Sequence, residues 1–465
     1  MPALLFSLLT AALAQDGTEP PPVRSDLLTA TPAARTAEIR VATRNATIYR
    51  AASTGGATRG LVEKGDAFRV YEHVGGTGCP GEGWARTDAD GFVCLANTAP
   101  ATAVPTRQPD LVPFDPPTPE EFATYRDTGV YERSPPDPSL AILPDIYGKP
   151  WRQWKGRIYA NQAAFERGAA PLGNLEKGRK AHFVGTVETT KGTLLVRENG
   201  QVIPADDVWL YPVSRHAGRD LQRDPVPAGM WIAWATSYEA TKVFTEPRAD
   251  APVAKVLPYH SQLLIRDHAV DPAGHWWEVP DAVAPGIAGY VEDIDGIRHP
   301  NPATPPEGLS PTQVWYDVDL ATQTLTVHEG HRPIYITMVS TGEPGHSTPV
   351  GLYTIYQKAV AWDMASRADV AAEDVYYVEA VPWTMHFRPR YALHGAYWHW
   401  GYGHTASHGC VNLSLIDAKY LFDLANPSLP DGWSTIATTK EDLATLVRVR
   451  QGQTPAPDRR SASHY

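Results

Sequence analysis

Residues 391–413 read YALHGAYWHWGYGHTASHGCVNL and hold four histidines together with Cys410. A cysteine attacks as its thiolate, and at an ordinary pKa of ~8.5 only a few per cent of the thiol is ionised near pH 7. A neighbouring imidazole and donors near a helix N-terminus would lower that pKa. We therefore expect Cys410 to be the nucleophile of an acyl transfer. His394, which follows the strand-like residues 391–393, is its expected base.

The tetrapeptide Ser407-His408-Gly409-Cys410 has the composition of a nucleophile turn. Gly409 permits a backbone angle that other residues rarely adopt, so successive amides could point at one oxyanion. The alternative at this stage is that Cys410 is a packed core residue. His399 and His404, flanked by aromatic residues, are expected to be loop or groove residues and not catalysts.

Zinc is a further alternative, because histidine and cysteine are its preferred protein ligands. The chain has no HExxH motif and no CxxC pair. We therefore predict neither a metal site nor a cofactor.

Strand patterns precede this stretch and a helix pattern follows it. Apolar residues alternate over 314–318, 324–327 and 334–339, as in strands with one buried face. Residues 358–380 carry scattered charges and alanines and are expected to form an inserted helical cap. Apolar residues recur at helical spacing after Asn412, with Ser414 as the expected N-cap.

The motif resembles the catalytic domain of the L,D-transpeptidases, whose signature is a His-Gly or similar dipeptide, a variable loop and then [Ser/Thr]-His-Gly-Cys-x-Asn. Here His394 is followed by twelve residues, Gly395 to Ala406, and then by Ser407–Asn412. Ser340-Thr341-Gly342 and the run from Thr348 to Tyr353 also look like family features. The resemblance covers residues 312–450 and implies a mostly β domain, with one or two short helices, that acts on peptidoglycan.

The resemblance also implies roles for individual residues. Cys410 would attack the carbonyl between residue three and D-Ala of a stem tetrapeptide, and His394 would take the thiol proton. The Gly395 carbonyl would orient His394, the amides around Gly409 would hold the oxyanion, and His408 would support the site. The residues expected to contact substrate are Ser407, Asn412, Trp383, Met385, Phe387 and Trp398.

Glycine (37) and proline (43) are abundant among the 465 residues, which favours many turns and a mainly β chain. Short alternating apolar runs predict small β-barrels at 38–98 and 230–298, and a weaker pattern predicts one at 155–213. These barrels resemble bacterial Src-homology-3-like modules. Residues 15–37 are expected to be a linker, 99–154 a proline-rich linker and extension, and 451–465 a disordered tail.

Residues 3–14 form an apolar run that ends in an Ala-x-Ala-like pattern, so residues 1–14 are expected to be a signal peptide. Export to the periplasm or cell wall would allow Cys79 and Cys94 to pair, leaving Cys410 as the free thiol. The sequence contains no run of 18 or more apolar residues, so no membrane-spanning helix is predicted. The net charge of -11 gives no support for nucleic-acid binding, and a monomer is expected.

Three alternatives stay open beside a transpeptidase. Water as the acceptor would make the chain an L,D-carboxypeptidase. A papain-like wall endopeptidase is disfavoured, because in those enzymes the cysteine precedes the histidine. An inactive wall-binding scaffold is disfavoured because both Cys410 and His394 are present.

Overall fold

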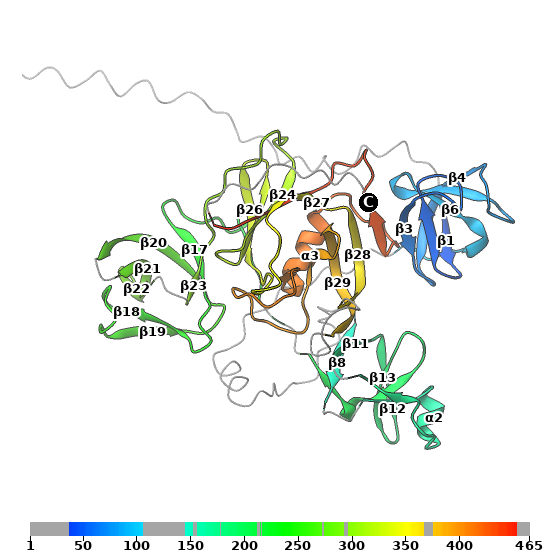
Figure 1. Ribbon diagram of the computed structural model, residues 1–465, viewed down its shortest axis with the longest axis horizontal. Coiled ribbons are helices and arrows are strands. Elements are labelled where there is room, and N and C mark those ends of the chain that lie inside the picture. Colours follow the sequence, from blue (N-terminus) through cyan, green and yellow to red (C-terminus); the bar gives the residue numbers. More distant parts are fainter. Residues whose placement is uncertain are drawn as a thin grey trace, which may run out of the picture.

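The computed structural model describes residues 37–105, 145–151, 156–176, 178–211, 214, 216–271, 274–292, 296–366 and 375–452. The predicted signal peptide, nearly all of the predicted lead-in, most of the proline-rich linker and most of the tail lie outside these ranges. The chain is mainly β, as predicted. Three small β units surround a central one (Figure 1). Neither α-helix in the described ranges has the length and apolar character that a membrane span needs.

The N-terminal unit (residues 38–100) is an antiparallel sheet whose strands bury alternate side chains. Ile48 and Phe68 are fully buried in its core. This agrees with strands in the region predicted to be a barrel, 38–98. Its strands are β1 (Glu38–Ala42), β2 (Ala46–Tyr49), β3 (Thr58–Val62), β4 (Ala67–Val74), β5 (Trp84–Thr87), β6 (Phe92–Cys94) and β7 (Thr98–Pro100).

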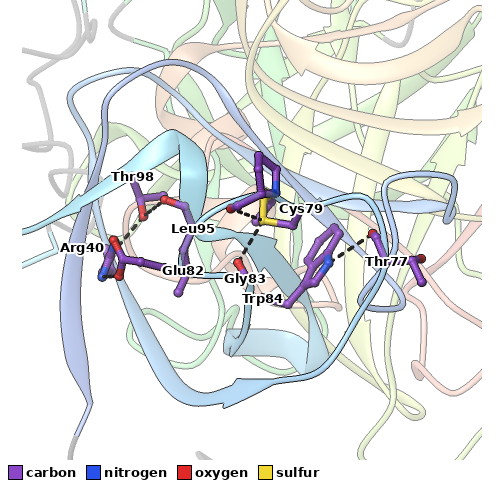
Figure 2. The surroundings of a disulfide bond; sticks show 10 residues. Arg40, Thr77, Cys79, Glu82, Gly83, Trp84, Leu95 and Thr98 are labelled. Atoms are coloured by element: carbon purple, nitrogen blue, oxygen red, sulfur yellow. Dashed lines mark hydrogen bonds and ion pairs between the residues drawn. A yellow bond between two sulfur atoms is a disulfide. The ribbon is translucent and has the colours of Figure 1, made fainter.

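A disulfide joins Cys79 and Cys94, which confirms the predicted pairing. It ties the loop between β4 and β5 to the end of β6 (Figure 2). The Trp84 indole N–H donates to the Thr77 carbonyl at 3.2 Å and holds the same loop. Glu82, in the same loop, forms an ion pair with Arg40 of β1 at 2.9 Å.

The second unit (residues 145–211) begins earlier than the predicted 155–213. β8 (Ile146–Pro150) lies in the segment predicted to be linker, yet it pairs antiparallel with β11 (Arg179–Phe183) and with β15 (Val208–Leu210). Its sequence IYGKP has too little alternation to signal a strand. The other elements are β9 (Arg157–Ile158), α2 (Gln162–Glu166), β10 (Gly173–Asn174), β12 (Gly185–Thr189), β13 (Gly192–Val196) and β14 (Val202–Pro204).

The third unit (residues 231–298) has its own apolar core, which includes Ala233, Val243 and Val291. Strands fill the predicted 230–298. They are β17 (Trp231–Ala235), β18 (Thr241–Phe244), β19 (Val253–Leu257), β20 (Gln262–Asp271), β21 (Gly274–Ala284), β22 (Ile287–Glu292) and β23 (Ile297–Arg298). The assignment of these small units to the Src-homology-3-like class stays a prediction.

The fourth unit (residues 313–450) packs two sheets and one helix around the largest apolar core. It contains the expected catalytic residues and is called the catalytic unit below for that reason. One sheet holds β24 (Val314–Asp319), β25 (Thr324–Glu329), β26 (Arg332–Met338), β27 (Gly351–Thr354) and β33 (Leu446–Arg450), with β16 (Arg219–Asp220) at its edge. The other holds β28 (Gln357–Ala365), β29 (Tyr377–Arg388), β30 (Tyr391–Gly395), β31 (Val411–Leu413) and β32 (Thr435–Ala437).

Two local predictions for this unit had different outcomes. The helix is confirmed as α3 (Leu415–Leu424), and Ser414 caps it by accepting from the Asp417 amide at 3.0 Å. The helical cap expected over 358–380 is wrong in its described part, where the chain forms the paired strands β28 and β29. Strand pairing with a long neighbour outweighs the weak helical preference of this segment.

The flanking units pack against the catalytic unit. β3 pairs with β32, and Arg59 forms an ion pair with Asp442 at 2.6 Å. β11 runs parallel to β29. In the third unit, Tyr259 donates to the Tyr402 carbonyl at 2.7 Å. All three units therefore contact the catalytic unit directly.

Replacing Cys79 and Cys94 together by serine should lower the free energy of unfolding of the N-terminal unit by about 3 kcal/mol, because a cross-link over some 15 residues restricts the unfolded chain. Urea unfolding followed by the fluorescence of Trp84 and its neighbours measures this change. An unchanged unfolding midpoint would contradict the prediction. The alkylation rate of Cys410 in the folded variant is the control and should stay the same.

Candidate active site

β30 and β31 lie side by side, and they bring the segments that hold the two expected catalytic residues next to each other. They pair in parallel, with Leu393 opposite Val411 and His394 opposite Asn412. Side chains alternate along a strand, so Leu393 and Val411 enter the core, while His394 and Asn412 share the other face. Cys410 lies one residue before β31 and two before Asn412, which puts it on the same face as His394.

Position 395 requires a small residue, because the core-facing side of the strand is closely packed there. A Cβ atom at this position would lie 3.0 Å from Cδ2 of Leu415 in α3 and 3.2 Å from Pro382. Its carbonyl serves the site instead, since it lies 3.2 Å from Nδ1 of His394. This contact is the one that the resemblance implied for Gly395.

The turn before Cys410 depends on the backbone angle of Gly409, whose φ is +118°. A side chain there would be strained, and its Cβ would lie 2.6 Å from the Tyr391 ring. Cys410 itself is partly exposed. Its thiol lies 3.8 Å from the Arg390 carbonyl. The thiol is thus at the surface end of the turn and not in packed core.

Ser407 and Thr348 brace this turn from inside. Ser407 Oγ donates to the Cys410 carbonyl at 2.6 Å and accepts from the Gly409 amide at 3.0 Å. Thr348 Oγ1 donates to the Gly409 carbonyl at 2.8 Å and accepts from the Gly342 amide. Ser407 is 6% exposed. It therefore holds the turn, which corrects its expected role in contacting substrate.

His394 is a neutral imidazole in this environment. The ring is 1% exposed, and burial lowers its pKa to about 4, although the Gly395 carbonyl opposes that shift. Because Nδ1 faces a carbonyl oxygen, the proton belongs on Nδ1 and the lone pair on Nε2. His394 therefore has the tautomer that a base needs.

The Cys410 thiol is also neutral. Burial raises its pKa to about 11, and a hydrogen bond from the Ala392 amide opposes this only in part. The expectation that the surroundings lower this pKa is wrong. Removing water from a thiolate costs more than the hydrogen bond from the backbone amide returns. The resting pair is thus thiol and imidazole, not thiolate and imidazolium.

His399 and Asn412 form a second layer behind His394. The Asn412 amide lies 2.7 Å from Nε2 of His399, and the Gly401 amide donates to Nδ1 of the same ring at 3.2 Å. Asn412 is 2% exposed. Through His399 it fixes the loop that follows His394, which is a structural role in shaping the site. Its contact with substrate stays a prediction.

His408 and Trp398 lie at the rim of the site. His408 is exposed, and its ring lies 4.6 Å from that of His346 and 5.2 Å from that of Tyr376. Trp398 is partly buried, with its ring 5.6 Å from the His394 ring. Both positions are compatible with the predicted supporting and substrate-facing roles.

Trp383, Met385 and Phe387 were expected to line the groove, and their burial corrects this expectation. They are 1%, 0% and 2% exposed and belong to the core of the catalytic unit. Substrate cannot contact side chains that are covered in this way. They support β29, the strand that pairs with β30.

Several residues near the site escaped the sequence analysis. In the sequence, Thr348 stands out only as part of a family-like run. Its hydrogen bond to the Gly409 carbonyl joins segments that are distant in the sequence, so only the folded structure shows it. Tyr376 lies in the segment expected to be helical, and it contacts His408. Lys180 comes from the second unit, and its ammonium group lies 5.6 Å from the Trp398 ring. No local motif marks these residues.

The site offers nothing that resembles a metal centre. Across the described ranges, no three His, Cys, Asp or Glu side chains gather where they could hold a metal ion. Cys410 and His394 remain the expected reactive groups. An acyl transfer through a thioester needs no others for bond making.

Comparison with known families identifies the domain that carries this site. Residues 313–447, under a third of the chain, match the family model of the L,D-transpeptidase catalytic domain. This agrees with the predicted family and with the predicted span 312–450. No curated protein sequence matches the chain.

Solved structures similar to the chain include three L,D-transpeptidases. A mutant of the Enterococcus faecium enzyme is 20% identical, with 30% of this chain and 50% of that chain covered and a TM-score of 0.23. L,D-transpeptidase 3 from Mycobacterium tuberculosis is 21% identical (36% and 76%, TM-score 0.25). The Mycobacterium smegmatis enzyme is 18% identical (52% and 89%, TM-score 0.25). The chain thus spans half the length of the first of these proteins.

The neutral resting pair predicts how Cys410 alkylation depends on pH. With a thiol pKa of about 11, the rate with iodoacetamide should rise about tenfold per pH unit from pH 7 and level off near pH 11, because the thiolate reacts. Mass spectrometry of the labelled protein gives the rate, with Cys410→Ala as the unlabelled control. A rate that is already constant below pH 7 would reveal a preformed thiolate–imidazolium pair and contradict the prediction.

Proposed function

We propose that the protein is an exported L,D-transpeptidase that transfers the acyl group of a peptidoglycan stem tetrapeptide to an amine. The observation that carries the proposal is the parallel pairing of β30 and β31, in which His394 lies opposite Asn412, two residues after Cys410. This pairing lies inside the segment that matches the L,D-transpeptidase catalytic domain. The substrate, the acceptor and export are parts of the proposal.

In the proposed first step, the Cys410 sulfur attacks the carbonyl of stem residue three while the thiol proton passes to Nε2 of His394. The imidazolium that forms keeps its Nδ1–H on the Gly395 carbonyl, which stabilises its charge. Collapse of the tetrahedral intermediate breaks the C–N bond, and His394 returns the proton to the leaving D-Ala amine. A thioester on Cys410 remains.

In the proposed second step, the acceptor amine occupies the place that D-Ala has left. His394 takes a proton from this amine as it attacks the thioester, and the thiol regains a proton when it leaves. Because both pKa values favour neutral groups at rest, charge forms only during each transfer. The site must then stabilise charge in the transition state and not in the free enzyme.

The oxyanion needs donors that the turn does not already use. The Gly409 amide donates to Ser407 Oγ, so it is not free for this purpose. We assign the role to the Cys410 amide, for which the described part of the chain provides no acceptor. Gly409 then contributes through its backbone angle and not through its N–H group.

The flanking units are proposed to frame the site and not to act as loosely tethered anchors. β11 of the second unit pairs with β29, and the third unit holds the loop between His394 and Ser407 through Tyr259 and Arg298. Such contacts limit the side from which a strand of peptidoglycan can approach. Independent binding of the wall by these units would add to this role.

Muropeptide analysis of walls treated with the purified enzyme tests the proposed reaction. We expect new cross-links between stem peptides and loss of D-Ala from tetrapeptides. Tripeptides without cross-links would identify water as the acceptor and replace the transferase by an L,D-carboxypeptidase. Cut bridges would point to an endopeptidase, and unchanged muropeptides would contradict the proposal.

Cys410→Ala should abolish the covalent adduct that a tetrapeptide muropeptide leaves on the wild-type protein in intact-mass spectra. His394→Ala should slow adduct formation by about 100-fold to 10,000-fold, the usual contribution of a general base. Circular dichroism of both variants controls for folding. An adduct on Cys410→Ala would place the nucleophile elsewhere.

A further inference from the structure

Two lysines of the second unit lie at its boundary with the catalytic unit: the ammonium group of Lys180 lies over the Trp398 ring, and that of Lys149 lies over the Trp209 ring of its own unit. In the pairing of β11 with β8, Ala181 lies opposite Gly148, so Lys180 and Lys149 are opposite each other at the next position. Side chains at opposed positions of antiparallel strands share a face. Tyr147, two residues before Lys149, lies on that face too, and its ring stacks on Tyr397 of the catalytic unit at 4.0 Å. This face of the second unit therefore covers the loop that follows His394.

The chain of contacts from His394 to Lys180 is short. The His394 ring lies 5.6 Å from the Trp398 ring, and Nζ of Lys180 lies 5.6 Å from the same ring. Lys180 is also close enough to His399 to lower the pKa of that imidazole by charge repulsion. The lysine is partly exposed, so a ligand can reach it.

Neither lysine has a counter-ion in the described part of the chain. Glu379 lies on β29, the strand that pairs with β11. It already forms ion pairs with Arg179 at 2.6 Å and with Arg197 at 2.7 Å. Asp145 pairs with His182 at 2.7 Å. Burial and the charge of Lys149 both lower the pKa of Lys180, and no carboxylate opposes them. Like charges directly opposite on a sheet are destabilising, and an anion between them would remove this cost.

We propose that Lys180, assisted by Lys149, forms a carboxylate subsite for the leaving D-residue of the donor peptide. This inference rests on the proposed function. His394 must deliver its proton to the amine of the leaving D-Ala, so that residue lies next to His394. Its free carboxylate is one carbon beyond the amine. On the side of His394 where Trp398 lies, Lys180 is a cation without a counter-ion in the described part of the chain.

The same subsite would select among acceptors. In the second step the acceptor amine takes the place of the leaving amine. An acceptor whose amine-bearing carbon also carries a carboxylate would present an amine and a carboxylate in the same arrangement as D-Ala. A donor that continues beyond the fourth residue has no carboxylate at this point. The second unit would therefore supply selectivity for peptides that end at residue four.

The test compares Lys180→Met with the wild-type protein on two synthetic tetrapeptides with diaminopimelate at position three, one ending in D-alanine and one in D-alaninamide. Wild-type protein should prefer the acid, and Lys180→Met should reduce the ratio of kcat/KM for acid over amide about 10-fold to 100-fold, the range for a hydrogen bond between charged groups. Lys191→Met is the matched control. Lys191 belongs to the same unit but lies against Phe165 and Glu166.

Thermal unfolding gives a second, independent measurement. If Lys180 were only structural, its replacement would lower the melting temperature. We expect Lys180→Met to keep or raise it, because a partly buried unpaired charge is removed. Iodoacetamide labelling of Cys410 shows that the site is intact in the variant.

The outcomes separate the two proposals. An unchanged ratio in Lys180→Met, or an equal loss on acid and amide, would overturn the carboxylate subsite while leaving the transpeptidase proposal in place. Failure of the wild-type protein to form a thioester with the acid peptide would instead overturn the proposed function, on which the subsite rests.

Discussion

The parallel pairing of β30 with β31 is the constraint on which the site depends. It joins two segments that are separated by the loop 396–410, and it fixes which side chains share a face. Leu393 and Val411 enter the core, and this burial sets the register. A slip of one residue would expose them and turn His394 and Asn412 inward. The free energy that holds the catalytic pair in place is therefore mostly that of the apolar core, to which Cys410 and His394 contribute little.

The same burial sets the protonation states. His394 is almost without water contact, so its charged form is disfavoured, and the partial burial of Cys410 likewise disfavours its thiolate. The candidate site keeps Cys410 and His394 neutral at rest, so in the proposed reaction charge would develop only during each transfer. The Gly395 carbonyl is placed to meet the charge on His394, and backbone amides of the turn could meet that on the oxyanion. Fixed dipoles of this kind need no reorganisation when the transition state forms.

The sequence predicted the parts of the site that are local and missed those that are not. Cys410, His394 and Gly409 stand in one short motif, so they could be proposed together, and Ser414 precedes a clear helical pattern, which sufficed to predict the N-cap. Trp383 was misplaced because β29 is buried on both faces over much of its length, and such a strand has no alternation that separates core from groove. Thr348 and Lys180 act through contacts between distant segments, which neither composition nor periodicity encodes.

The boundaries between units show why a division into independent modules is too simple. Trp433 and Ile436 of the catalytic unit complete the core of the N-terminal unit. In return, Tyr147 and Tyr211 of the second unit lie in the core of the catalytic unit. The loop between His394 and Ser407 is held from outside by the third unit, through Tyr259 and by Arg298, which donates to the Gly403 carbonyl at 3.0 Å. A loop that is tied at both ends to catalytic residues transmits any displacement to them. The flanking units thus contribute to the geometry of the site itself, and a catalytic unit without them would lack part of its core and the support of its catalytic loop.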